Sequence, residues 1–144
     1  MPTLERSALL PYPADQVYRL INDIEAYPQF MKGCIDAEVL VQNEDLIEAR
    51  LDLQKAGLKQ SFTTRNRLQP PSLIDMELVD GPFSNFSGRW EVQALNEVAC
   101  KVTLFLNFTL SNRVVSAAAG ALFNPVADNL VDALVKRANE LYGK

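Results

Sequence analysis

A single change in hydrophobic period along the chain limits the folds open to it. Residues 34–110 alternate apolar and polar side chains at every second position, which is the period of a half-buried strand. Residues 112–142 instead repeat apolar side chains at the spacing of a helix. Turn-forming segments divide the first region into six strands, and residues 3–10 predict one more. We therefore predict an α+β fold with about seven antiparallel strands and a long C-terminal helix.

Proline positions mark the remaining elements. Pro13 is well placed as the first residue of a helix whose apolar positions run from Ala14 to Ile21. Residues 24–32 are aromatic and interrupted by a proline, so we predict a loop with at most one helical turn. Pro125 falls inside the C-terminal apolar stripe and should kink or split that helix.

An antiparallel sheet with one apolar face needs a partner layer. The C-terminal helix is the only predicted element long enough to cover this face. The sheet should therefore curve around the helix, within a single domain spanning residues 1–144. Residues 116–121 are all small. Where they face the sheet, they either enlarge an apolar cavity or allow the helix and the sheet to pack closely.

The residue types exclude several kinds of chemistry. The 144-residue chain contains no histidine, which removes His-based nucleophile systems, imidazole acid–base chemistry and His-ligated zinc. Its two cysteines cannot form a four-thiolate zinc site. Glu77 and Asp80 could act as acid or base if desolvated, but the sequence offers no base–nucleophile pair and no metal set. These features favour a binding protein over an enzyme, with no metal and no catalytic cofactor.

Charge and the N-terminal sequence bear on partners and location. The formal net charge of −4 at pH 7 argues against a DNA-binding protein and against any dominant nucleic-acid footprint. The first residues form neither a signal peptide nor a transit peptide, and no stretch approaches the roughly 18 apolar residues of a membrane span. We expect a cytoplasmic protein of bacterial type.

Three motifs, in this order, resemble those of a known superfamily. They are Tyr27–Met31 followed by Gly33-Cys34, Lys59–Asn66, and Leu78–Phe83 followed by Gly88-Arg89-Trp90. Together they resemble the coenzyme-Q-binding branch of the START-like, helix-grip superfamily, a branch that includes the bacterial RatA-type ribosome-association toxins. The resemblance covers residues 3–142 and implies a single START-like domain with a non-enzymatic function.

The resemblance implies two functions. Our leading expectation is that a cavity between the sheet and the C-terminal helix binds a polyisoprenoid quinone such as ubiquinone, or a similar lipid, in support of respiration. The alternative is a toxin of a type II toxin–antitoxin system, which binds the large ribosomal subunit and blocks subunit association. The two functions are not exclusive, and the sequence does not rank them firmly.

Candidate ligand-binding residues come from loops, strands and the long helix. Tyr27, Phe30 and Phe83 lie in segments that we predict to be irregular, where they suit a lid or an edge that touches a membrane, or else close off the core. Inward-pointing strand residues are either core or ligand contacts, and the polar ones need a hydrogen-bond partner, which a quinone carbonyl could supply. The full set is Tyr27, Phe30, Phe62, Thr64, Asn66, Phe83, Trp90, Leu106, Phe108, Ala118 and Leu122.

Cationic side chains with outward strand parity could form a patch that faces RNA. They are Arg50, Lys59, Arg65, Arg67 and Arg89. The expected hairpin registers, however, place Glu48 and Glu77 opposite Arg65, and Asp75 opposite Arg67. Opposite charges paired across strands are the usual way to solvate an outer sheet face, so we favour a charge ladder over an RNA-binding patch.

Overall fold

The predicted antiparallel sheet is confirmed. The computed structural model describes residues 3–31, 33–55, 58–70, 72–81, 83–110 and 129–143. Seven antiparallel strands form one sheet in the order β1-β7-β6-β5-β4-β3-β2, so β2 to β7 are a meander and β1 joins it beside β7. The strands are β1 (Thr3–Leu10), β2 (Cys34–Gln42), β3 (Leu46–Lys55), β4 (Leu58–Gln69), β5 (Leu73–Asp80), β6 (Phe83–Asn96) and β7 (Ala99–Leu110).

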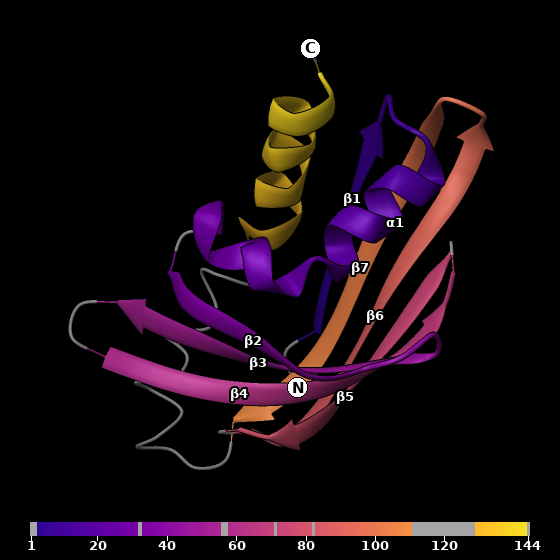
Figure 1. Ribbon diagram of the computed structural model, residues 1–144. Helices are drawn as coiled ribbons and strands as arrows, with labels where there is room; N and C mark the ends of the chain where they lie inside the picture. Colours follow the sequence, from indigo (N-terminus) through magenta and orange to yellow (C-terminus); the bar gives the residue numbers. More distant parts are fainter. Residues whose placement is uncertain are drawn as a thin grey trace.

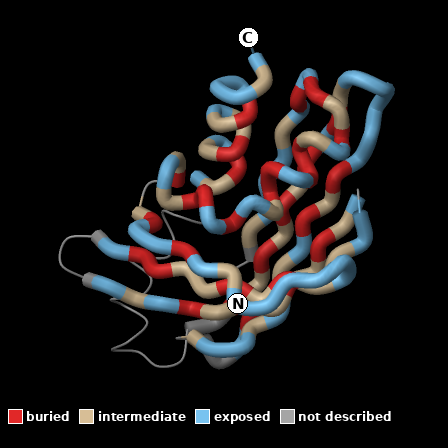
Figure 2. The backbone as a smooth tube through the Cα atoms, in the orientation of Figure 1, coloured by how far each residue is buried: buried red, intermediate tan, exposed pale blue. Residues whose placement is uncertain are grey.

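The sheet is strongly curved, and the helices lie on its concave side (Figure 1). Strand residues of one parity face these helices and are buried, while their neighbours face outward, as the alternating colours of Figure 2 show. Val102 and Leu104 of β7, for example, have no exposed surface. This alternation is what the period of two in the sequence predicts, and the expected helix-grip arrangement is confirmed.

Short connections between consecutive strands fix their registers. Glu48 lies opposite Arg65, Arg65 opposite Glu77, and Arg67 opposite Asp75. Arg65 places its guanidinium nitrogens 3.2 Å from a carboxylate oxygen of Glu48 and 3.5 Å from one of Glu77. The predicted registers and the predicted charge ladder are therefore both confirmed.

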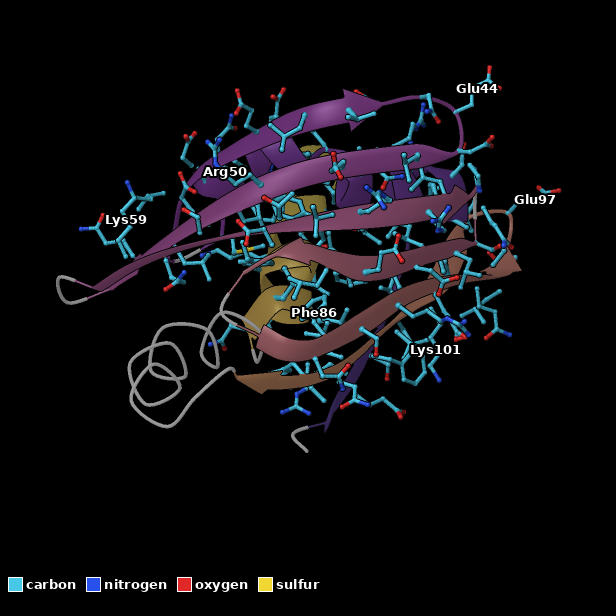
Figure 3. The ribbon with its side chains drawn as sticks, turned by 90° about the horizontal axis from the view of Figure 1, so that it is seen from below. Glu44, Arg50, Lys59, Phe86, Glu97 and Lys101 are labelled. Atoms are coloured by element: carbon cyan, nitrogen blue, oxygen red, sulfur yellow. The ribbon has the colours of Figure 1, made fainter. Side chains whose placement is uncertain are left out.

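In the ion pairs of the outer sheet face, which is seen in Figure 3 with Arg50 labelled, carboxylates outnumber arginines. Arg50 alone contacts three carboxylates, and the shortest of these contacts is 2.8 Å, to Glu38. Asp52 also accepts a hydrogen bond of 2.6 Å from the Ser61 hydroxyl. Across this face the four arginines Arg50, Arg65, Arg67 and Arg89 are paired with the six carboxylates of Asp36, Glu38, Glu48, Asp52, Asp75 and Glu77.

Strand β6 begins earlier than the sequence indicated. Phe83 is its first residue and pairs with Leu110, so the prediction that Phe83 lies in a turn is wrong. A register shift separates Phe83 from Asn85 along this pairing. Residues 84–88, Ser-Asn-Phe-Ser-Gly, have no regular apolar alternation. Backbone pairing with β7 forms this part of the strand, and such pairing leaves no mark in the side-chain pattern.

Two short helices follow β1. Helix α1 (Ala14–Asn22) begins directly after Pro13, which is its N-cap rather than the predicted first helical residue. Residues 24–32 were predicted to be a loop with at most one helical turn, but residues Ile24–Gln29 form the 3-10 helix η1, so that prediction is wrong. A helix with three residues per turn does not produce the 3.6-residue period by which helices are recognised.

The C-terminal helix spans residues 129–142 within the part of the chain that is described. Val131, Leu134 and Ala138 lie at helical spacing and are buried, so this helix turns its apolar stripe toward the rest of the molecule. Tyr12, after β1, donates a hydrogen bond of 2.6 Å to Asn139 Oδ1 and so ties the helix to the N-terminal part of the chain. Residues 111–128, which include the small residues 116–121 and Pro125, lie outside the described residues.

Candidate functional site

A cavity of about 70 Å³ lies between the concave face of the sheet, α1, η1 and the C-terminal helix. Apolar side chains make up most of its wall, and three polar residues from α1 and β4 interrupt it. The lining residues are Ile21, Asn22, Ile24, Tyr27, Met31, Ala49, Leu51, Phe62, Thr64, Asn66, Ile74, Met76, Phe86, Trp90, Leu106 and Leu130.

More than half of the candidate residues from the sequence meet at this cavity. The cavity-lining members are Tyr27, Phe62, Thr64, Asn66, Trp90 and Leu106. Phe108 has the predicted inward parity and is buried, but it belongs to the core and does not line the cavity. The side chain of Phe83, together with all of Ala118 and Leu122, lies outside the described residues.

Phe30 lies beside the cavity rather than in its wall. Its ring meets the ring of Tyr27 edge to face, with the centroids 5.5 Å apart. The Arg137 guanidinium of the C-terminal helix lies over the Phe30 ring, with its central carbon 5.4 Å from the ring centroid. Arg137 also donates a hydrogen bond of 3.1 Å to the side-chain oxygen of Gln29. These contacts join η1 to the C-terminal helix.

Two hydrogen bonds fix the positions of polar side chains at the cavity. Thr64 Oγ1 donates a hydrogen bond of 3.0 Å to Asn66 Oδ1, and both side chains are buried. The Tyr27 hydroxyl donates to the backbone carbonyl of Ile21. Burial raises the pKa of Tyr27 well above its ordinary value, and the nearby charges of Asp23 and Cys34 add to the rise. This phenol therefore stays neutral at physiological pH.

Sequence reasoning missed several cavity residues. Ala49, Leu51 and Met76 share the inward parity of the candidates, so strand alternation was a signal that could have found them. Asn22 is different, because it is the last residue of α1 and nothing in the sequence shows which way this end of the helix faces. Its Oδ1 atom is buried and accepts no hydrogen bond.

The size of the cavity limits what it can hold without rearrangement. Pockets that enclose small molecules typically have volumes of roughly 300–1,000 Å³. A cavity of about 70 Å³ accommodates such a ligand only if side chains move aside. Met31 and Met76 are in its wall, and the unbranched thioether side chain of methionine adjusts more readily than other core residues.

Other features of the described residues bear on chemistry. Among them, no group of three or more histidine, cysteine or acidic side chains is arranged to hold a metal ion. Both cysteines are buried and free, and burial raises the pKa of each thiol, which leaves little thiolate at neutral pH. Within the same ranges, no helix has the length and apolar character that crossing a membrane requires.

A curved sheet wrapped around a helix, with an apolar cavity between them, is the architecture of START-like proteins. The model of the family described as "polyketide cyclase / dehydrase and lipid transport" matches residues 10–135, and the chain belongs to this family. The resemblance noted in the sequence is thereby confirmed.

Relatives within the family carry two kinds of name. The chain is 46% identical over 140 residues to "Ribosome association toxin RatA" of Pseudomonas aeruginosa, and the match covers 97% of each protein. It is 41% identical over 142 residues to the RatA of Escherichia coli K12, which covers 99% of this chain and 90% of that one. It is 25% identical over 147 residues to "Coenzyme Q-binding protein COQ10, mitochondrial" of Dictyostelium discoideum, which covers 98% of this chain and 71% of that one.

Solved structures share the fold at low sequence identity. An aromatase/cyclase from Streptomyces sp. R1128 superposes with a TM-score of 0.82 at 18% identity, over 96% of this chain and 93% of that one. A START superfamily protein from Mycobacterium smegmatis gives a TM-score of 0.78 at 19% identity, over 96% and 98% of the two chains. At these identities the likeness concerns the fold alone and does not transfer the cyclase activity.

Proposed function

We propose that this protein is a ribosome-association toxin that binds the large ribosomal subunit and blocks its joining to the small subunit. The proposal rests on the 46% identity to a relative named for ribosome association, over 97% of both chains. This identity ranks ribosome association, which the sequence analysis gave as the alternative function, ahead of quinone binding. The protein then acts in the cytoplasm and by binding rather than by catalysis.

Charge limits where ribosomal RNA can be contacted. The chain carries a net charge of −4, and the arginines of the outer sheet face are already paired with carboxylates. Among the described side chains, the cations without a salt bridge are Lys59, Lys101 and Lys136. Lys59 and Lys101 lie on different parts of the sheet in Figure 3. Contact with rRNA through such unpaired lysines releases counterions, so the affinity should fall steeply with salt.

Sucrose-gradient profiles of cells that overproduce the protein test the proposal. We expect more free subunits and fewer joined ribosomes than in cells with the empty vector, and we expect the protein to sediment with the large subunit. Unchanged profiles, together with no sedimentation with either subunit, would overturn the proposal. Repeating the sedimentation with purified subunits over a series of salt concentrations then measures the electrostatic share of the binding.

Matched charge variants locate the contact. Lys59→Gln, Lys101→Gln and Lys136→Gln each remove an unpaired cation, whereas Arg89→Gln removes one that already lies 2.8 Å from Asp75. A lysine that contacts a phosphate lowers the slope of log affinity against log salt by about one when it is replaced. We expect this change in at least one lysine variant and not in Arg89→Gln.

A second candidate function is the binding of a polyisoprenoid quinone, or a lipid like it, in the cavity. Two observations favour it: the apolar wall of the cavity and the similarity to a protein named for coenzyme Q binding. Candidate contacts are the predicted residues that line the cavity, above all Phe62 and Trp90. Tyr27 of η1 and Phe30, directly after η1, would then cover the ligand, and peripheral contact with a membrane would allow lipid exchange.

Native mass spectrometry and lipid extraction of the purified protein test this second function. A bound isoprenoid quinone or lipid at a defined ratio is the expected result. Trp90 is the only tryptophan of the chain and lines the cavity, so its fluorescence should change when a short-chain ubiquinone is added. Absence of any bound lipid, together with unchanged Trp90 emission, would overturn the proposal.

A further inference from the structure

One buried acceptor at the cavity has no donor. Asn22 ends α1 and lines the cavity, and its Oδ1 atom is buried without a hydrogen-bond partner. Buried polar atoms in proteins are nearly always paired, so an unpaired one at a cavity wall points to a missing group. The group that it lacks is a hydrogen-bond donor.

The hydrogen bonding of Tyr18 shows which group of the Asn22 side-chain amide, the oxygen or the NH₂, is unpaired. The Tyr18 hydroxyl donates its only proton to the backbone carbonyl of Leu73, at 2.8 Å. Burial raises the pKa of Tyr18, and a side-chain hydrogen bond with Asn22 partly opposes the rise. Because the Tyr18 hydroxyl proton is already committed to Leu73, any hydrogen bond between the Tyr18 oxygen and Asn22 must be donated by the amide NH₂. A flipped amide would place two acceptors together, so Oδ1 is the unpaired end.

Strand β4 presents an acceptor to the same cavity. Thr64 donates its hydroxyl proton to Asn66 Oδ1 at 3.0 Å, which leaves the lone pairs of Thr64 Oγ1 available. Thr64 and Asn22 both line the cavity, from the sheet and from α1 respectively. Unlike Asn22 Oδ1, however, Thr64 Oγ1 already takes part in a hydrogen bond, so only the Asn22 oxygen lacks a partner when the cavity holds no donor.

We propose that the cavity selects ligands whose polar head carries a hydroxyl group, and so prefers an isoprenoid quinol to the corresponding quinone. This inference rests on the second candidate function, ligand binding in the cavity. A quinol hydroxyl donates a hydrogen bond to Asn22 Oδ1, whereas a quinone carbonyl has no hydrogen to donate and would leave that oxygen unpaired. The remaining features of the two ligands, the ring and the isoprenoid tail, meet the same apolar wall. The discrimination arises at Asn22 alone.

Three probes of nearly equal shape test the proposal under anaerobic conditions. They are a short-chain ubiquinol, the matching ubiquinone, and the dimethyl ether of the quinol. The ether keeps the aromatic ring and the isoprenoid tail but has no hydroxyl hydrogen to donate. Titrations followed by native mass spectrometry give the three dissociation constants. One hydrogen bond gained at a buried acceptor corresponds to a preference of about tenfold for the quinol over both other probes.

Variants test whether Asn22 causes the preference for the quinol. Asn22→Leu removes the acceptor and should make the three probes bind alike. Asn107→Leu is the matched control, because Asn107 Oδ1 is also buried and unpartnered but does not line the cavity. If Asn22→Leu fails to fold, Tyr18→Phe serves instead, since it frees the amide to turn and should shrink the preference. Each of these proteins is checked by its thermal unfolding before titration.

The outcomes separate this inference from the function on which it rests. Equal binding of the three probes, tighter binding of the quinone, or a preference that survives in Asn22→Leu overturns the selection of hydroxyl heads while leaving ligand binding in place. Failure of all three probes to bind overturns both. Preference for the quinol in the wild type and in Asn107→Leu, lost in Asn22→Leu, supports the inference.

Discussion

Asp52 differs from the other carboxylates of the outer face in its burial. Its side chain is 12% exposed and is held by Ser61 at 2.6 Å and Arg50 at 3.2 Å, whereas that of Asp75 is 41% exposed beside Arg89. Asp52→Ala should lower the free energy of unfolding by about 1–2 kcal/mol, because it removes a largely buried carboxylate that accepts hydrogen bonds from Ser61 and Arg50. Asp75→Ala should cost less than about 1 kcal/mol. Urea denaturation of both variants checks this ordering, and equal losses would contradict it.

Gly88 leaves room for two side chains that line the cavity. A Cβ atom on this residue would lie 2.6 Å from Met76 Cε and 2.9 Å from Leu106 Cδ2, and both of these side chains line the cavity. Gly88→Ala should therefore push them into the cavity and weaken ligand binding, at a cost in stability of about 1–2 kcal/mol. Ser87→Ala, its exposed neighbour in β6, is the control. Ligand affinity unchanged in Gly88→Ala would show that these side chains have room elsewhere.

The Cys34 thiol makes the free energy of unfolding depend on pH in the alkaline range. Burial raises the pKa of Cys34 from an ordinary value of 9.0 to about 11. The unfolded chain therefore loses this proton before the folded chain does, so the stabilisation is present below pH 9 and is lost as the pH rises to about 11. Chemical denaturation across this window should show a steeper fall in unfolding free energy for the wild type than for Cys34→Ala. Parallel curves would mean that the thiol is accessible to water in the folded state.

Secondary-structure elements whose apolar side chains repeat regularly along the sequence could be predicted. Elements that depend only on backbone hydrogen bonding could not. Parity placed Thr64 and Trp90 correctly on the concave face, because the short turns leave little freedom of register. Helix η1 has no such period, and the start of β6 at Phe83 depends on pairing with β7. Asn22 could not be found either, since its place at the cavity depends on how α1 rests on the sheet.

Helix η1 packs against β2, and one side chain of the C-terminal helix ties its end to that helix. Arg137 bonds to Gln29 at 3.1 Å and lies over the Phe30 ring, with its side chain 19% exposed. Arg137→Met keeps the aliphatic stem but removes both interactions, and we expect faster hydrogen exchange of amides 24–31 with a loss of about 1 kcal/mol in stability. Lys136→Met, its exposed neighbour, should leave both unchanged. Exchange that is equally slow in the two variants would assign the stability of η1 to Tyr27 instead.

For the molecule as a whole, the concave and outer faces of the sheet have opposite character. The concave face is apolar and encloses the cavity, while the outer face carries paired charges with an excess of carboxylates. The two proposed functions therefore use different parts of the protein: a ligand is placed in the cavity, and the ribosome is placed at unpaired lysines outside it. If the two functions are independent, variants should separate them.

We predict such a separation. Gly88→Ala displaces two side chains that line the cavity, so it should weaken ligand binding and leave the sucrose-gradient profile of the overproducing cells as in the wild type. The lysine variant that lowers the salt slope of ribosome binding should retain the ligand affinity, because Lys59, Lys101 and Lys136 do not line the cavity. Loss of the ribosome effect in a stably folded Gly88→Ala would mean instead that the cavity and the ribosome-binding surface are energetically coupled. In that case, adding ligand to the wild type should shift its affinity for the large subunit by the same factor by which the subunit shifts its affinity for the ligand.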